Sequence, residues 1–187
     1  MTAPIFLETP RLLLRAVCQE DVTDEYLAWL NDVEVLRYRS PKAFPSTMES
    51  QRAYIAGIGA RGDLMLAICV RENRRHIGNI ALNSIQFVHR SAELGMMIGA
   101  KDVWGKGYAK EAISAVTTHA FANMGLERLW AESPNPAFNA AVRKLGWTKE
   151  GTRREAFLLD GVFVDLECWG LLKREWPLSC GAGAQAG

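Results

Sequence analysis

The sequence predicts a single mixed α/β domain with a sheet of about six or seven strands. Two observations support this fold class. The 187 residues are enough for one domain with a buried core. Strand-like apolar runs and helical patterns follow one another in the order β-α-α-β-β-β-α-β-α-β-β, without a repeat or an internal linker. We therefore place one domain at residues 1–176, followed by a flexible Gly/Ala-rich tail at 177–187.

The N-terminal half is predicted to contain four strands and two helices. Pro10 interrupts the first strand, because proline cannot donate to a strand ladder. Ser46 and Glu49 have the spacing of a capping box, which opens the second helix. The expected strands are 5–7 with 11–17, 65–70, 76–83 and 91–98, and the expected helices are 21–31 and 46 to about 57–59.

The C-terminal half adds two helices and three strands. Small and apolar residues recur at three- and four-residue spacing from Gly105 to Met124, which is typical of a helix with one buried face, and Gly125 ends it. Asp160 and Gly161 form a turn dipeptide between the last two strands. The other expected elements are a strand at 128–133, a helix at 136–145, and strands at 147–158 and 162–172.

The charge balance gives no electrostatic case for nucleic acid or an anionic membrane as partner. There are 22 basic and 21 acidic residues, and the net charge is +1. The N-terminus lacks a basic leader followed by a long apolar stretch, and no run of 18 apolar residues occurs. We therefore expect a cytoplasmic protein that does not span a membrane.

The cysteines and histidines do not predict a metal site. The four cysteines are far apart and lack CxxC spacing, and the three histidines are scattered. Small core side chains are the better interpretation of cysteines within apolar runs, so no metal is expected.

The segment 104–109 is a candidate phosphate-binding loop. Gly105 and Gly107 let the backbone curl so that successive N–H groups point at one anion. The helix that follows adds amides without internal partners and the positive end of its dipole. Lys106 adds a positive charge, and Ala109 keeps the first helical turn small enough for close approach.

Other phosphate motifs do not fit this segment. The P-loop pattern GxxxxGK[ST] is absent, and the dinucleotide fingerprint GxGxxG fails because Lys110 stands three residues after Gly107. Small residues that open a helix can also serve packing alone. The loop by itself leaves that interpretation open.

The loop stands among sequence blocks that resemble the GNAT acyltransferase superfamily, and within it the RimJ/RimL-like branch. The resemblance spans roughly residues 5–176, and the blocks occur in the family's order. They are LETPRLLLRAVCQEDV, YLAWLNDVEVLRY, HIGNIALNSI, AELGMMIG, VWGKGYAKEAI, NPAFNAAVRKLGW and KEGTRREAFLLDGVFVDLECWGLLKREW.

The resemblance implies a twisted sheet with helices on both faces, splayed between strands 91–98 and 128–133 to admit acyl-CoA. Acetyl-CoA is the expected co-substrate. Trp104 replaces the glutamine or arginine that usually opens the family's pyrophosphate motif. The positions that correspond to cofactor-binding residues are Met96, Met97 and Ile98 for the pantetheine and thioester, Trp104, Gly105, Lys106, Gly107, Tyr108 and Ala109 for the pyrophosphate, and Asn135 for the CoA arm.

Transfer to an amine needs a base, because a lysine-like amine is almost fully protonated at neutral pH. Glu93 is the candidate, since relatives carry basic carboxylates on the strand that binds the cofactor; the alternative is a substrate-binding or structural carboxylate. The tyrosine with which many relatives protonate the thiolate is replaced by Val142, and the serine common in this branch is replaced by Phe138. Tyr108 and Asn139 are weak alternatives, and no acid is assigned.

The sequence says least about the amine that accepts the acyl group. Tyr38 and His76 are candidates to line its cleft, although aromatic residues more often serve the core. The branch acts on ribosomal-protein N-termini, polyamines, antibiotics and amino-sugar nucleotides. We therefore expect a small-molecule amine or a peptide N-terminus. The small molecule is favoured because the strings YLAWLNDVEV and IGNIALNSI most resemble branch members that act on small molecules.

Two other functions remain open at this point. A GNAT domain that binds acyl-CoA without turnover would account for the missing acid. An unrelated nucleotide-binding α/β domain would account for the loop but not for the C-terminal blocks. A homodimer is also left open.

Overall fold

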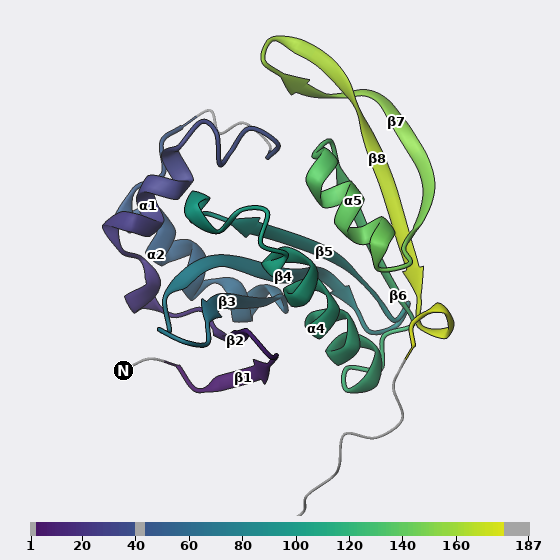
Figure 1. The fold of residues 1–187 in the computed structure, drawn as a ribbon, viewed down its shortest axis with the longest axis horizontal. Helices are drawn as coiled ribbons and strands as arrows, with labels where there is room; N and C mark the ends of the chain where they lie inside the picture. The colour runs from purple at the N-terminus through teal and green to yellow at the C-terminus, as the bar shows by residue number, and fades with distance from the viewer. Residues whose placement is uncertain (1–2, 40–43, 178–187) are drawn as a thin grey trace, which may run out of the picture.

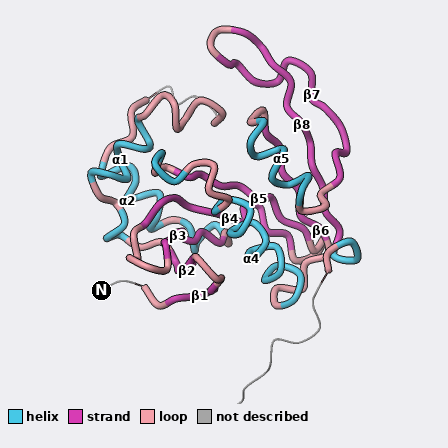
Figure 2. The backbone as a smooth tube through the Cα atoms, viewed as in Figure 1, coloured by secondary structure: helices cyan, strands magenta, loops and turns pink. Residues whose placement is uncertain are grey.

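The computed structural model describes residues 3–39 and 44–177, which form one mixed sheet of eight strands with helices on both faces (Figure 1 and Figure 2). The strand order is β1-β2-β3-β4-β5-β6-β8-β7. Neighbouring strands are antiparallel except β5 and β6, which are parallel. The strands are β1 (Ile5–Glu8), β2 (Leu12–Ala16), β3 (Leu64–Val70), β4 (His76–Gln86), β5 (Ser91–Ile98), β6 (Arg128–Ser133), β7 (Thr148–Leu159) and β8 (Val162–Leu172).

Within the described residues, five α-helices and two short 3-10 helices connect these strands, and a third 3-10 helix follows the last one. No helix within the described ranges is long and apolar enough to cross a membrane. The α-helices are α1 (Asp24–Asn31), α2 (Met48–Ala56), α3 (Ile58–Arg61), α4 (Tyr108–Ala122) and α5 (Pro136–Lys144), and the 3-10 helices are η1 (Gln19–Asp21), η2 (Lys101–Val103) and η3 (Lys173–Glu175).

The sheet has eight strands rather than six or seven, because the predicted first strand is a hairpin of two. Pro10 lies in the turn between β1 and β2, and the strands then run antiparallel. The Thr9 side chain fastens this turn: its Oγ1 accepts a hydrogen bond from the N–H of Leu12 at 2.8 Å. Proline is therefore excluded from the ladder by a reversal of the chain, not by a local break in one strand.

Three predicted helix starts were wrong. Helix α4 begins at Tyr108 rather than Gly105, because Gly107 is its N-cap and has a left-handed backbone. Helix α1 begins three residues late, with Thr23 as its N-cap, because Asp21 is held by Arg15 at 2.5 Å. Helix α2 is capped by Thr47 rather than Ser46. The amide side chain of Asn31 binds the backbone N–H and C=O of Ser46, at 2.9 and 3.0 Å, and keeps that residue outside the helix.

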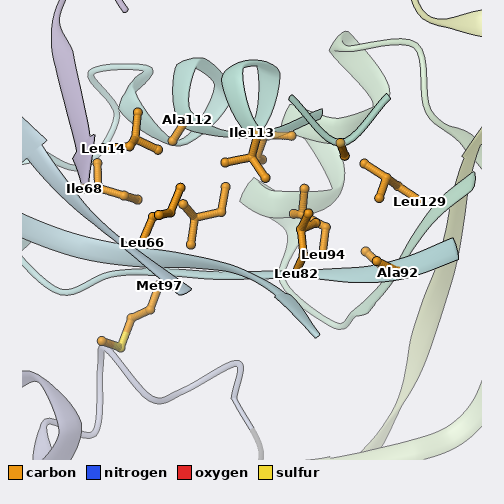
Figure 3. Close-up of a cluster of buried hydrophobic side chains, with 14 of the residues drawn as sticks. Leu14, Leu66, Ile68, Leu82, Ala92, Leu94, Met97, Ala112, Ile113 and Leu129 are labelled. Atoms are coloured by element: carbon orange, nitrogen blue, oxygen red, sulfur yellow. The ribbon is translucent and has the colours of Figure 1, made fainter. Parts of the chain in front are cut away.

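The main core lies between the sheet and α4. Figure 3 shows Leu82, Ala92 and Leu94 directed toward the same side of the sheet as Ile113 of α4, whereas Met97 points to the opposite side. Alternation along a strand requires this, since successive side chains point to opposite faces. Helices α1 and α2 cover that opposite side (Figure 1). One face of β5 therefore carries core residues, and the other is available for a site.

The end of β5 packs closely on α1. A Cβ added to Gly99 would overlap the indole ring of Trp29, a residue that is 7% exposed. Only glycine permits this approach, which fixes α1 over the last residues of β5.

Replacement of Gly99 by alanine should therefore destabilise the fold by about 1–3 kcal/mol, because a side chain is forced into a packed contact. Gly59→Ala is the matched control, since a Cβ there would meet nothing within 4 Å. Urea denaturation measures both variants. Equal stability of the two would contradict the packing described.

Candidate functional site

The decisive feature of the sheet is a gap between β5 and β6. The two strands pair only from Ser91 to Glu93, opposite Arg128 to Trp130. The backbone C=O of Arg90 accepts from the N–H groups of Glu127 and Arg128, at 2.7 and 3.2 Å, and holds the two strands together at this end. Beyond Glu93 no pairing is present, although β5 runs to Ile98 and β6 to Ser133. The remaining edges of both strands border an opening.

Backbone groups of alternate β5 residues face this opening. The C=O of Met96 accepts from Arg39 at 3.3 Å, and the C=O of Ile98 accepts from the indole N–H of Trp104 at 2.9 Å. Because the N–H and C=O of one strand residue point to the same edge, the N–H groups of Met96 and Ile98 also point to the opening. The alternation directs the backbone of Met97 toward β4 instead, where it is paired with Asn79.

The segment before α4 has the geometry of an anion-binding loop. Gly105 and Gly107 have φ of 75° and 80°, in the left-handed region that favours glycine. The backbone hydrogen bond from Glu111 to the C=O of Gly107 closes the first turn, so the N–H groups of residues 108–110 precede the intrahelical ladder. A Cβ on Gly105 would meet nothing within 4 Å. The loop therefore presents free donors on an open side.

Arg11 holds this loop in place. Its guanidinium donates to the C=O of Lys106 at 2.9 Å, pairs with Glu111 at 2.6 Å, and lies 4.7 Å from the ring centre of Tyr108. Burial alone would raise the pKa of Glu111, but hydrogen bonds from Thr9 and Arg11 outweigh it and lower the pKa. The carboxylate thus stays charged and keeps Arg11 beside the loop.

Glu93 lies at the point where β5 and β6 part. It is half-buried, and burial raises its pKa, as do the carboxylates of Glu132 and Asp63. Within the described chain its carboxylate has no hydrogen bond or ion pair, whereas Glu132 pairs with Arg153 at 2.6 Å and Asp63 pairs with Arg61 at 3.2 Å. An unpaired carboxylate with a raised pKa is suited to accept a proton near neutral pH.

A cavity of about 580 Å³ lies next to Glu93, on the side of the sheet that α1 and α2 cover; Glu93 is not itself a lining residue, but Asn83, its partner on β4, is. Its floor is formed by β4 and β5, and Gly95, the next residue of β5 on the face of Glu93, is part of its lining. The lining residues from the covering helices are Tyr26, Leu30, Ser50, Gln51 and Tyr54.

A second cavity, of about 550 Å³, lies between the β1–β2 turn and α4. It contains the ion pair of Arg11 and Glu111, whose charges already satisfy each other. The cavity that opens on β5 is therefore the better candidate for a substrate.

Comparison with known families agrees with this geometry. The family model described as an acetyltransferase (GNAT) domain matches residues 11–148, which include the gap, the loop and Glu93. The chain belongs to the GNAT acetyltransferase family.

Individual relatives cover nearly the whole chain. The uncharacterized N-acetyltransferase p20 of Bacillus licheniformis is 30% identical over 175 residues, which is 91% of this chain and 97% of that protein. The crystal structure of spermidine N-acetyltransferase from Vibrio cholerae in complex with CoA and spermine has a TM-score of 0.80 and 22% identity, and covers 89% of this chain and 98% of that one.

RimL, the ribosomal L7/L12 alpha-N-protein acetyltransferase, was solved in complex with coenzyme A and is equally similar in fold. Its TM-score is 0.80 at 22% identity, with 90% of this chain and 98% of that chain covered. At this identity the two solved structures show the GNAT fold, which confirms the fold class predicted from sequence.

The remaining residues expected to bind CoA are arranged around the gap. Lys106 is exposed on the loop, and Ala109 is in the first turn of α4. Asn135 is the N-cap of α5, and its Oδ1 accepts from the N–H of Ala137 at 2.9 Å. Both helices thus begin beside the opening that follows β5 and β6 (Figure 1). Direct contact of these residues with CoA stays a prediction.

The structure offers no familiar acid in the GNAT positions. Val142 is fully buried, and Phe138 packs against the core. Asn139 uses both ends of its amide, because it donates to the C=O of Ser133 at 3.3 Å and accepts from Trp169 at 3.2 Å. These contacts tie α5 to β6 and β8 and leave Asn139 a structural role.

Tyr38 and His76 do not line the cavity beside Glu93. The guanidinium of Arg37 lies 5.6 Å from the ring centre of Tyr38. The Nε2 of His76 lies 2.9 Å from Oδ1 of Asn79, which is a lining residue. His76 therefore orients a side chain of the cavity wall without lining the cavity itself. Burial lowers the pKa of His76, which favours the neutral ring.

Sequence reasoning missed Arg11, Glu111 and Arg39. Arg11 lies in a block that the family resemblance singled out, but nothing in the spacing shows that it reaches a loop 95 residues away. No group of three or more histidine, cysteine or acidic residues suited to a metal occurs in the described part of the chain.

Gly107→Glu should abolish binding of CoA, because it adds bulk and negative charge where the free amides converge. Isothermal titration with CoA measures the effect. Gly146→Glu is the matched control, since Gly146 has a similar φ of 84° and open space around it but follows the C-terminal end of α5 and presents no free helix amides. Normal CoA affinity of the Gly107 variant would show that the loop does not bind the phosphates.

Proposed function

We propose that this GNAT enzyme transfers an acetyl group from acetyl-CoA to a primary amine by direct attack in a ternary complex. The observation that carries the proposal is the gap between β5 and β6, with a donor loop at one end and Glu93 at the other. CoA supplies the acetyl group as a reactive thioester. Groups of this chain bind the cofactor and remove the proton from the amine.

The donor side uses backbone N–H groups. Those of residues 108–110 bind the pyrophosphate, aided by the positive end of the α4 dipole. The N–H groups of Met96 and Ile98 face the opening and can bind carbonyl oxygens of the pantetheine arm and the thioester. Such donors need no reorganisation, because the sheet already fixes them.

On the acceptor side, Glu93 removes a proton from the ammonium, directly or through a water. The pKa of Glu93 is raised above that of an ordinary glutamate, so its carboxylate is a stronger base. The thiolate leaving group has a pKa of about 8.5 in solution, so it can take its proton from water or from the positively charged nitrogen of the tetrahedral intermediate, which thereby becomes the amide. No dedicated acid is needed for this route.

The acceptor is a small-molecule amine or a peptide N-terminus. A solved neighbour is named for spermidine and another for ribosomal L7/L12. The cavity beside Glu93, about 580 Å³, is of the size that holds a small molecule. This favours the small-molecule amine.

An acyl-CoA-binding scaffold without turnover is the alternative. Its support is the position of Val142, fully buried where many relatives carry a tyrosine. Release of free thiol from acetyl-CoA, measured over a panel of polyamines, aminoglycosides, amino-sugar nucleotides and N-terminal peptides, separates the two functions. Tight acetyl-CoA binding without thiol release for any amine would establish the scaffold.

Glu93→Gln should lower kcat by about 100-fold or more in that assay, because a base is lost. The wild-type rate should fall as the pH drops through the raised pKa of Glu93, since only the carboxylate accepts a proton, and the variant should lack this limb. Glu72→Gln, in the exposed turn between β3 and β4, is the control. An unchanged rate and pH profile for the Glu93 variant would remove Glu93 from the mechanism.

A further inference from the structure

The cavity beside Glu93 has an unusual charge pattern for a site that binds amines. Among its described lining residues Arg39 alone carries a charge, and no carboxylate is present. The other polar lining groups are neutral: Tyr26, Ser46, Ser50, Gln51, Tyr54, Asn79 and Asn83. A polyamine would meet a like charge here without a compensating acid. The lining instead matches a ligand with a negative group.

Arg39 is in a position to bind such a group. One of its guanidinium nitrogens donates to the C=O of Met96 at 3.3 Å, which holds the side chain where the cavity meets the gap. No ion pair with a carboxylate is present for Arg39 in the part of the chain that the structure describes. The remaining N–H groups of its planar fork suit a carboxylate or a phosphate.

A second donor faces the same cavity. The hydroxyl of Tyr26, a residue only 2% exposed, accepts from the side chain of Asn79 at 3.3 Å. Burial raises the pKa of Tyr26 to about 12, so the hydroxyl keeps its proton at neutral pH. Asn79 is in turn oriented by His76. The Tyr26 proton is therefore available to an acceptor oxygen inside the cavity.

The opposite charge gathers at the other end of the same surface. The carboxylates of Glu132 and Asp63 both act on Glu93; each also pairs with an arginine, so the unpaired carboxylate at this end is that of Glu93 itself. Glu93 and Met96 are three residues apart on β5, which is about 10 Å along the strand. An ammonium group is thus favoured near Glu93 and an anionic group near Arg39. A molecule with both groups, separated by several bonds, fits the two ends at once.

We propose that the acceptor is an amine that also carries a carboxylate or a phosphate, and that Arg39 binds this anionic group. The inference rests on the proposed acetyl transfer and narrows its substrate class. It excludes simple polyamines as preferred acceptors. Arg39 acts on substrate affinity, not on the proton transfer at Glu93.

The test compares amines in pairs that differ only in the anionic group. The carboxylate arm uses 4-aminobutyrate against butylamine, and the phosphate arm uses glucosamine 6-phosphate against glucosamine, with spermidine as the polyamine. Thiol release from acetyl-CoA gives kcat/KM for each. The anionic member of at least one pair should be better by about 10-fold or more, as expected for a charge-assisted hydrogen bond to arginine. The arm that responds identifies the anionic group.

Arg39→Gln should remove this preference through KM for the amine and leave KM for acetyl-CoA unchanged. Arg37→Gln is the matched control: Arg37 pairs with Asp160 at 2.6 Å, is not a lining residue, and should keep the preference. A preference that survives in the Arg39 variant would overturn the proposal. So would equal rates within both pairs, or spermidine as the best acceptor.

Calorimetry on the protein saturated with CoA separates this inference from the proposed function. Tighter binding of an anionic amine than of its neutral partner, lost in Arg39→Gln, would support the anion site even if no amine were acetylated. Binding without any preference would overturn the anion site, whether or not the protein acetylates amines.

Discussion

The parting of β5 and β6 after three paired residues is the constraint on which the rest of the site depends. A sheet normally satisfies its backbone by pairing each inner strand on both sides, and an unpaired inner edge is costly unless something binds it. Here the elements on either side of the open edge are held by close contacts. Helix α1 lies against the end of β5 through Gly99 and Trp29, while α5 is tied to β6 and β8 through Asn139.

The open edge of β5 is asymmetric in its chemistry. The side chains of Arg39 and Trp104 donate to the C=O groups of Met96 and Ile98, whereas the N–H groups of these two residues are left available to a ligand. The loop before α4 continues this pattern, because it also presents N–H groups. A ligand rich in acceptor oxygens is therefore favoured along the whole opening, and an amide and pyrophosphate chain such as that of CoA has this character. The carboxylate of Glu93 lies at the closed end of the opening, where β5 and β6 part.

Much of the fold was predictable because its signals are local. The strand at 128–133 is confirmed. The turn at Asp160 and Gly161 is confirmed as well, and both of these residues have a positive φ. The β1–β2 hairpin was missed because one proline fits a break and a reversal equally well. The start of α2 was missed because Asn31, 15 residues earlier, decides which hydroxyl caps it.

For the site, the donor loop was accessible from sequence because glycine and helix signals coincide there. The residues that hold it and line the acceptor cavity were not accessible. Arg11 reaches Lys106 across 95 positions, and Arg39 reaches Met96 across 57. His76 was a reasonable candidate by residue type, but only tertiary packing shows that it stands behind Asn79. Long-range contacts of this kind leave no periodic trace in the chain.

Amide NMR during titration with CoA tests the binding edge most directly. If CoA occupies the gap, the N–H signals of Met96, Ile98 and residues 108–110 should shift and become protected from hydrogen exchange, while that of Met97, which faces β4, should change little. Shifts confined to the cavity between the β1–β2 turn and α4, with the β5 edge unaffected, would contradict a cofactor site between β5 and β6.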